Sequence, residues 1–363
     1  MDTHAVINLE AIRSNCRKLS NFAGQPVLAP IKAGGYGHGA VAVASALEAD
    51  PSTNCVGFAV ATAFEVFELR AAGITLPVVL LTPPAASDLP KLIAEDSSFV
   101  VSSIDEIQSL QSEAHAQNVR VKVHLKVNTG LNRLGARNED AAKVLLELAR
   151  CSNLTLEGVM THLVDSEDFN PEHATVQIER FSAFLEAHQP DAKYVHAANT
   201  GGVLNRDLGA HFNLVRPGIG LYGYAPGPDM NGIVALEPAM TLRARVIFVK
   251  EVKAGEVTSY NAMWTAEKDT RLATIRLGYA DGYPRALSNR AGMVLNGRIV
   301  PVAGRVCMDQ TLLEIADLDV ALGDQAIAFG PGAITVETLA VLAQTNAYEL
   351  LTGIGARVQR LYV

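Results

Sequence analysis

The segment of this chain with the clearest chemical potential is a lysine followed by a glycine-rich loop. It reads APIKAGGYGHG over residues 29–39. The apolar run 26–31 is typical of a buried strand, so Lys32 would lie at the C-terminal end of that strand. Desolvation there lowers the pKa of an amine and makes it a nucleophile, which favours Schiff-base chemistry. A lysine that merely reaches the solvent is the alternative.

Polar groups lie at the ends of several further apolar runs or in the loops just after them, and they include backbone N–H groups beside a hydroxyl. These residues are Lys126, Arg133, His162, His196, Asn199, Thr200, Arg216, Gly218 and Ile219. The N–H groups of Gly218 and Ile219, together with the hydroxyl of Thr200, are suited to bind a phosphate. A Schiff-base lysine beside a phosphate site indicates pyridoxal 5'-phosphate (PLP). A sugar-phosphate aldolase would show the same two signals, so these residues alone leave both readings open.

The elements that must position these residues alternate in type along the first 220 residues. Helical patterns separate eight short apolar runs, at 26–31, 55–60, 78–81, 98–101, 121–127, 156–161, 194–197 and 214–216. Such alternation implies a parallel sheet, and eight units predict a closed (β/α)8 barrel with its active site at the C-terminal strand ends. An open doubly wound sheet is the alternative, but no G-x-G-x-x-G motif follows the first run.

The second part of the chain has a different pattern. Strand-like segments are predicted at 241–249, 273–277, 293–295, 298–302, 311–315 and 325–329, with one helix near 336–344. Asn296-Gly297 between two apolar runs is a strong hairpin signal. The Pro- and Gly-rich segment 225–232 would be the linker. We therefore predict a PLP-binding barrel domain over residues 1–227 and a mostly antiparallel β domain over 228–363.

Composition limits the partners and the compartment. The formal net charge of −8 and the absence of a Lys/Arg run argue against nucleic acid. The chain has no run of 18 apolar residues, so we expect no membrane span. Its four cysteines lie far apart without metal-ligand spacing, which predicts free thiols and no metal site. The start, MDTHAVINLE, lacks the apolar core of a signal peptide, so we expect a cytoplasmic protein.

Eight motifs, in order along the chain, resemble those of the PLP-dependent alanine racemases. They are IKAGGYGHG, LKVNTGLNRLG, GVMTHLVDSED, VHAANTGGVL, VRPGIGLYG, VTSYNAMW, IRLGYADGYPR and GRVCMDQ. The resemblance runs essentially end to end. It implies a barrel followed by a β domain, and a homodimer whose active sites are shared between subunits.

The resemblance also implies residue roles. Lys32 would hold PLP and act as one base, and Tyr260 of the partner subunit would act as the second. Further cofactor contacts would come from Tyr36, His162, His196, Asn199, Thr200, Arg216, Gly218, Ile219 and Tyr348. Arg216 would face the pyridine nitrogen. Arg133 and the backbone of Met308 would bind the substrate carboxylate, with Asp309 nearby in the substrate site. Lys126 matches a lysine that is often carbamylated in this family.

The implied reaction interconverts L- and D-alanine, for peptidoglycan or for alanine catabolism. A serine-type or broader racemase is the main alternative. A decarboxylase is disfavoured because Arg216 replaces the acid that would keep the ring nitrogen protonated, and a PLP carrier would not need the second domain. Two departures from the family pattern bear on the site. Gly34-Gly35 replaces Asn-Ala, which predicts a more flexible loop, and Asn128 replaces Asp, which leaves carbamylation of Lys126 open.

Overall fold

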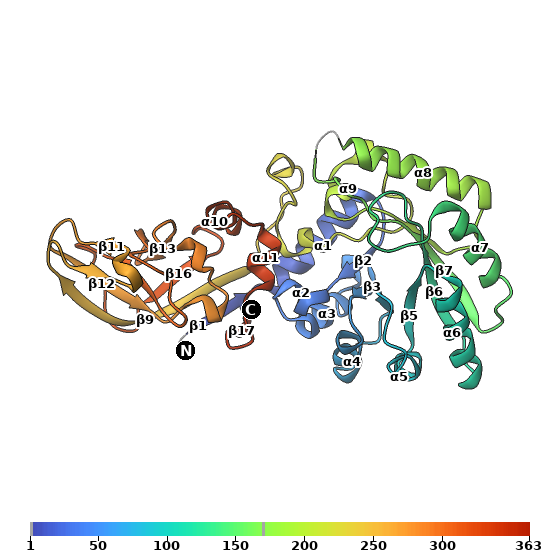
Figure 1. The fold of residues 1–363 in the computed structure, drawn as a ribbon, viewed down its shortest axis with the longest axis horizontal. Helices are drawn as coiled ribbons and strands as arrows, with labels where there is room; N and C mark the ends of the chain where they lie inside the picture. The colour runs from blue at the N-terminus through green and yellow to red at the C-terminus, as the bar shows by residue number, and fades with distance from the viewer. Residues whose placement is uncertain (1–2, 169–170) are drawn as a thin grey trace. The chain divides into compact units, whose positions relative to one another are not determined.

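The chain folds into two compact units. The computed structural model describes residues 3–168 and 171–363. Of these, residues 11–35, 40–168 and 171–237 form an α/β unit, and residues 3–10, 36–39 and 238–363 form a β unit (Figure 1). Two short segments from the N-terminal part of the chain, 3–10 and 36–39, therefore belong to the unit built mainly from the C-terminal part.

The α/β unit is built on consecutive parallel strands. They are β2 (Val27–Pro30), β3 (Cys55–Val60), β4 (Val78–Leu80), β5 (Ser97–Val101), β6 (Val121–Lys126), β7 (Leu154–Met160) and β8 (Tyr194–His196). Each strand pairs with the next in chain order. Most of their residues are buried, as expected for strands covered on both faces. The first seven predicted strands are thus confirmed, and the barrel-type fold with them.

The predicted eighth strand is a single β-bridge between Val27 and Val215 rather than a regular strand. Leu28 N donates to Val215 O (2.9 Å), and Val215 N donates to Pro26 O (3.0 Å). On the other side, Arg216 N donates to Ala198 O (2.8 Å). The segment therefore joins the chain after β8 to β2 and closes the barrel. The ladder stays short because Pro26 has no N–H to donate.

Helices separate these strands, and Figure 1 shows α4 to α8 arranged outside them. The helices are α1 (Leu9–Ala23), α2 (Lys32–Tyr36), α3 (Ala40–Glu48), α4 (Ala63–Ala71), α5 (Leu89–Ala94), α6 (Ile104–Ala116), α7 (Asn138–Leu148), α8 (Glu172–His188) and α9 (Thr200–Leu204). Short 3-10 turns are η1 (Pro51–Thr53), η2 (Arg206–Leu208), η3 (Ile219–Tyr222) and η4 (Pro228–Met230). Capping boxes start α4 at Thr62 and α6 at Ser103, which explains why these two helices begin where they do.

The β unit is mostly antiparallel. Its strands are β1 (Thr3–Ile7), β9 (Met240–Val252), β10 (Val257–Thr258), β11 (Trp264–Thr265), β12 (Thr270–Ile275), β13 (Gly292–Leu295), β14 (Arg298–Pro301), β15 (Thr311–Glu314), β16 (Gln325–Phe329) and β17 (Gln359–Tyr362). Its helices are α10 (Val336–Ala343) and α11 (Ala347–Thr352), and its 3-10 turns are η5 (Tyr260–Ala262), η6 (Tyr279–Asp281) and η7 (Arg285–Leu287). The long strand β9 pairs with β1, β12 and β16 and so organises the sheet.

The hairpin predicted at Asn296-Gly297 is confirmed. It joins β13 to β14 by a two-residue loop, with Leu295 opposite Arg298. Asn296 has φ 46° and Gly297 has φ 79°. These positive angles match the right-handed twist of the two strands, which is why this residue pair suits the turn.

Sequence analysis did not identify the strands at the two chain ends. β1 lies antiparallel to β9 and parallel to β17. Its partners are more than 200 residues away in the sequence, and local pattern carries no information about such pairing. Among residues 3–168 and 171–363, no helix is long and apolar enough to cross a membrane.

Candidate active site

Lys32 begins α2, separated from the end of β2 by Ile31 alone, and α2 is a left-handed turn rather than a regular helix. Ala33, Gly34 and Gly35 have φ values of 53°, 61° and 63°. Gly35 N donates to Ile31 O (2.7 Å), and this bond closes the turn. A left-handed backbone costs an L-residue about 1–2 kcal/mol, and glycine largely avoids that cost. The left-handed turn therefore favours glycine at positions 34 and 35.

Glu65 ties the turn to the start of α4. Its Oε1 accepts a hydrogen bond from Ala33 N (2.6 Å), and its Oε2 accepts from Ala61 N (2.7 Å) and Thr62 N (3.0 Å). The carboxylate is buried. It therefore holds the backbone next to Lys32 and places one negative charge near the lysine amine.

The barrel site is otherwise rich in positive charge. Burial lowers the pKa of Lys32; the charges of Arg133 and Arg216 lower it further, while Glu65 opposes them. Burial, followed by the charges of Arg216 and Arg133, lowers the pKa of Lys126 to about 8. Cationic groups gathered in this way suit an anionic ligand, because a ligand of opposite charge offsets the cost of their burial and mutual repulsion.

Arg216 is held from several sides in the barrel interior. Its Nη1 donates to His196 Nδ1 (2.6 Å), and its Nη2 donates to Thr161 O (2.8 Å) and Ala197 O (3.1 Å). The Nδ1 atom of His162 lies 3.4 Å from Nη2. Burial lowers the pKa of Arg216 to about 10, so the guanidinium remains charged at neutral pH. The predicted grouping of Arg216 with both histidines is present.

A line of buried hydrogen bonds continues from Arg216 to Glu157. His196 Nε2 lies 2.9 Å from His124 Nδ1, and His124 Nε2 lies 3.2 Å from Glu157 Oε2. Burial, aided by the charge of Arg216, holds the pKa of His196 well below its ordinary range. Because arginine only donates and a carboxylate only accepts, both histidines must carry their proton on Nε2. Arg216 at one end and Glu157 at the other thus determine the tautomer of His196, whose Nδ1 presents its lone pair to Arg216.

The candidate phosphate site lies where α9 and η3 begin. Asn199 caps α9 through its side-chain oxygen, and Gly220 N donates to Thr200 Oγ1 (3.1 Å). Ile219 opens η3, and Gly218 precedes it. Amides at the start of a helical turn have no acceptor within that turn, so the N–H groups of Gly218 and Ile219 suit an external oxygen anion.

Asn128 shapes the loop that joins Lys126 to Arg133. Its Oδ1 accepts hydrogen bonds from Gly130 N (3.3 Å) and Asn132 N (3.0 Å). The side-chain amide of Asn128 thus supplies the oxygen acceptor that a carboxylate would supply. Asn128 therefore organises this loop without adding a negative charge to it.

Two of the predicted phosphate ligands lie together in the β unit. The ring centroids of Tyr36 and Tyr348 are 6.1 Å apart. Burial raises the pKa of Tyr36 to about 12, so its hydroxyl stays protonated and can donate to an anion. Arg360 Nε donates to Gly37 O (3.1 Å), and an added Cβ at Gly37 would lie 2.1 Å from Leu351 O. The segment 36–39 therefore depends on close backbone packing against α11.

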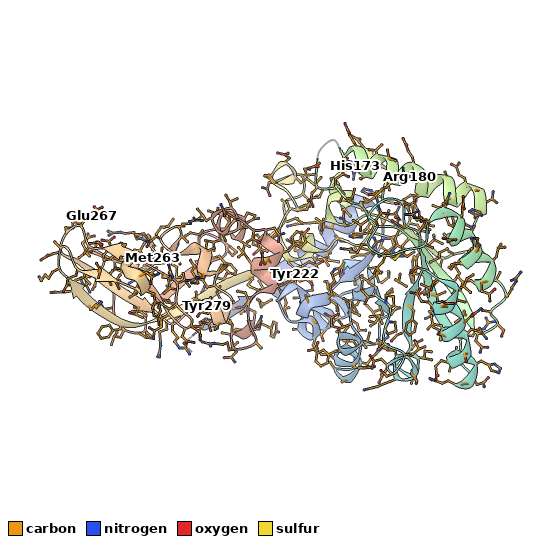
Figure 2. All side chains as sticks on the ribbon, in the orientation of Figure 1. His173, Arg180, Tyr222, Met263, Glu267 and Tyr279 are labelled. Atoms are coloured by element: carbon orange, nitrogen blue, oxygen red, sulfur yellow. The ribbon has the colours of Figure 1, made fainter. Side chains whose placement is uncertain are left out.

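Tyr260, the predicted second base, lines an open hollow of about 410 Å³ in the β unit. Tyr279 and Arg305 line the same hollow. The side chain of Tyr260 is 68% exposed, and that of Tyr279 is 42% exposed. Figure 2 labels Tyr279 and Met263 on this unit. These exposed aromatic side chains are what a surface that completes a neighbouring site would present.

Met308 and Asp309 lie on a loop that an ion-pair cluster holds in place. Arg357 Nη2 pairs with Asp309 Oδ1 (2.6 Å), and Arg357 Nε pairs with Asp281 Oδ1 (2.7 Å). Ala280 N donates to Met308 O (3.0 Å). The side-chain charge of Asp309 is thus already paired, whereas the Met308 side chain is exposed.

Three polar residues that support these groups, Glu65, His124 and Glu157, were not among the residues predicted from the sequence. The pattern Thr62-x-x-Glu65 before an apolar run is a capping-box signature and could have identified Glu65. His124 lies two positions before Lys126 on β6, so the period of a strand places both on one face. No comparable local signal marks Glu157. Within residues 3–168 and 171–363, no group of His, Cys, Asp or Glu side chains could hold a metal ion.

The fold and this site define an α/β-barrel enzyme with a second, β unit, a cationic site around the half-buried Lys32 and no metal cluster among its described residues. Comparison with known proteins narrows the class. The family description "Alanine racemase, N-terminal domain" matches residues 7–226, and "Alanine racemase, C-terminal domain" matches residues 239–362.

Individual relatives are similar to this chain over nearly their whole length. The chain is 40% identical over 360 residues to the alanine racemase of Deinococcus deserti, covering 99% of this chain and 98% of that protein. It is 40% identical over 370 residues to the alanine racemase of Carboxydothermus hydrogenoformans, with 99% of both covered. The crystal structure of the alanine racemase from D-cycloserine-producing Streptomyces lavendulae superposes with a TM-score of 0.94 at 33% identity, covering 100% of this chain and 97% of that one. This chain belongs to the alanine racemase family, which makes it an isomerase.

Proposed function

We propose that this chain interconverts L- and D-alanine with PLP as its cofactor. The observation that carries the proposal is the half-buried Lys32, whose pKa is lowered, at a strand end beside Arg216 and Arg133, in a chain of the alanine racemase family. The relatives from Deinococcus deserti and Carboxydothermus hydrogenoformans are named alanine racemases.

The residues present fit PLP and an amino acid. A phosphate group and a substrate carboxylate are both anionic, and they would balance the charges of Lys32, Lys126, Arg133 and Arg216. Tyr36, whose pKa is raised to about 12, offers a protonated hydroxyl to the phosphate. When bound, PLP supplies the electron sink that makes the Cα proton of an amino acid removable.

Lys32 supplies the first of two bases. Its lowered pKa increases the fraction of neutral amine, whose Nζ can take a proton from Cα on one face of the substrate. Glu65 keeps this amine in place through the Ala33 backbone, because the carboxylate binds Ala33 N at 2.6 Å. Arg133 would hold the substrate carboxylate and so orient Cα toward the base.

Tyr260 would supply the second base, from the other subunit of a homodimer. Its Oη would take or return the proton on the opposite face of Cα. The exposed side chains of Tyr260, Tyr279 and Met308 support such a contact, since a partner subunit would cover them. Two bases, one on each face, can exchange the proton directly, and this arrangement would provide both.

Arg216 would face the ring nitrogen of PLP as a hydrogen-bond donor. It would not transfer a proton there at neutral pH, since its pKa is about 10 even when buried. By leaving that nitrogen without a proton, Arg216 would weaken the electron sink and so would favour return of the proton to Cα over side reactions. This chemistry speaks for racemisation and against decarboxylation.

Lys126 is the proposed site of a carbamate. Its pKa of about 8 leaves part of the amine neutral near physiological pH, and a neutral amine adds CO2 with release of one proton. The new negative charge would lie among the cations of the site and would orient Arg133. Asn128 does not compete for this role, because it carries no charge.

D-alanine made by this reaction would serve peptidoglycan synthesis, or the enzyme would serve alanine catabolism. The proposed location is the cytoplasm, where thiols stay reduced. Cys16, Cys55, Cys151 and Cys307 are all free.

The test is chiral chromatography of the purified chain, with PLP, against a panel of L-amino acids. Formation of D-alanine well above every other D-product supports the proposal. D-serine as the main product would assign the alternative racemase, and loss of the carboxylate as CO2 would assign a decarboxylase. Dilution until only monomers remain should abolish turnover; an active monomer would contradict the shared site.

A further inference from the structure

The loop that carries Tyr260 has an unusual backbone. Ser259 has φ 69° and ψ 170°, Asn261 has φ 62°, and Ala262 has φ 48°. The Ser259 angles fall in a region that essentially only glycine occupies without strain, and left-handed angles also disfavour ordinary residues. Three non-glycine residues around Tyr260 adopt these angles, so contacts outside the loop must maintain them.

The side chain of Ser259 makes one such set of contacts. Its Oγ donates to Arg305 O (3.1 Å) and accepts from Arg305 N (2.8 Å). The Ser259 hydroxyl thus binds both the backbone N–H and the backbone C=O of Arg305. The neighbouring Gly304 has φ 87°, and a Cβ there would lie 2.6 Å from Ser259 Cβ. Glycine at 304 therefore permits the close approach.

Asn289 makes the second set. Its Nδ2 donates to Met263 O (2.7 Å), and its Oδ1 accepts from Gly304 N. The loop 259–263 is thus bound at its start through Ser259 and at its end through Asn289. Both contacts lead to the same backbone segment, 304–305.

We infer that Ser259 and Asn289 are positioning residues that hold the Tyr260 loop in its strained conformation. The side chain of Tyr260 is 68% exposed, so packing within its own chain does little to orient it. Its position must then come from the backbone, which these two side chains hold. The inference rests on the proposed role of Tyr260 as the second base. The clamp, by which we mean the hydrogen bonds of Ser259 and Asn289 to the segment 304–305 and to Met263, can be tested separately from that role.

The first test measures hydrogen–deuterium exchange of the full chain by mass spectrometry, over peptides that contain residues 257–265 and 303–306. Ser259→Ala should speed exchange in both peptides, because it removes both bonds to Arg305. The control is Ser288→Ala. Ser288 Oγ also donates to a backbone carbonyl, that of Arg285, and accepts from Val306 N (3.0 Å), and neither of these two hydrogen bonds involves residues 259–263. It should leave exchange at 257–265 unchanged.

The second test asks which face of the substrate is affected. With alanine deuterated at Cα, Ser259→Ala should raise the isotope effect severalfold for one enantiomer, the same one that Tyr260→Phe affects. The other enantiomer should keep the isotope effect of the parent chain. Ser259→Gly should be the milder variant, because glycine can adopt φ 69° without strain. Ser288→Ala should match the parent for both enantiomers.

Two results would overturn the inference: unchanged exchange at 257–265 in Ser259→Ala, or isotope effects that rise equally for both enantiomers. If Ser259→Ala does not fold, Asn289→Asp decides, since it keeps the acceptor for Gly304 N but loses the donor to Met263. It should speed exchange at 257–265, and unchanged exchange there would again overturn the inference. A parent chain that does not racemise alanine would refute the proposed function, while the exchange experiment would still judge the clamp.

Discussion

Replacing Glu65 by Gln is expected to weaken the α/β unit and to change the chemistry of Lys32. Both carboxylate oxygens of Glu65 accept backbone hydrogen bonds, Oε1 from Ala33 N and Oε2 from Ala61 N and Thr62 N. A glutamine has one acceptor oxygen, so its NH2 group would face at least one backbone N–H. At a buried position this donor–donor contact leaves N–H groups without an acceptor, which costs free energy of folding.

A matched variant isolates this effect. Glu106 forms the capping box of α6, but both of its backbone bonds, from Ser102 N (2.6 Å) and Ser103 N (3.2 Å), go to Oε2. The amide oxygen of Glu106→Gln can keep both. Hydrogen bonds to charged groups contribute about 1.5–3 kcal/mol each, so we expect a loss of about 3 kcal/mol for Glu65→Gln and at most about 1 kcal/mol for Glu106→Gln.

Thermal unfolding of the two purified variants measures the difference. For a unit of this size, 1 kcal/mol corresponds to about 2–4 °C in Tm. Glu65→Gln should therefore lower Tm by about 9 °C and Glu106→Gln by at most about 3 °C. The charge of Glu65 raises the pKa of Lys32, so its removal should lower that pKa further and speed the labelling of Lys32 by an amine-directed reagent at neutral pH.

Equal loss of stability in the two variants would refute the reasoning, because it would mean that the bond to Ala33 contributes nothing beyond an ordinary cap. Slower labelling of Lys32 in Glu65→Gln, in protein that is still folded, would refute the electrostatic part. Labelling in Glu106→Gln should equal that of the parent chain and serves as the reference for both.

Three further predictions concern single residues. Tyr260→Phe should raise the Cα deuterium isotope effect for one alanine enantiomer only, and equal changes for both would exclude two separate bases. Lys126→Met, in CO2-free buffer, should stabilise the chain by roughly 3 kcal/mol at pH 7, since the folded pKa of about 8 lies below the ordinary 10.5 and the charged form is destabilising. That gain should shrink as pH rises from about 8 to about 10.5 in urea unfolding, and a pH-independent difference would count against it. Gly34→Ala should lower the free energy of unfolding by about 1 kcal/mol and alter the labelling of Lys32. The control, Gly73→Ala, is also at positive φ with open space around it, so it should lower the free energy of unfolding by as much and leave the labelling of Lys32 unchanged.

Much of the barrel could be predicted because its strands are short, apolar and regularly spaced. Lys32, Lys126, His162 and Arg216 lie at or just after the ends of such runs, and parallel strands bring their C-terminal ends to one edge. The motif resemblance then supplied roles that spacing alone could not. The hairpin at Asn296-Gly297 was predictable for a local reason, since its two residues tolerate the positive φ angles that the turn requires.

Other features depend on contacts between distant parts of the chain. Glu65 carries a local capping signal, but its bond to Ala33 N spans 32 residues. The line from Arg216 through His196 and His124 to Glu157 draws on four separate segments: β6, β7, β8 and the segment 214–216.

The amino-acid sequence by itself determined which segments become strands and helices, which chemical groups stand at the strand ends, and which family the chain resembles, because each follows from local pattern or motif. Only the tertiary structure decided that β1 joins the β unit, that Lys32 begins a left-handed turn, and that Ser259 and Asn289 hold the Tyr260 loop. Those outcomes depend on hydrogen bonds and close approaches between residues far apart in the chain, and such contacts form only when the whole unit has folded.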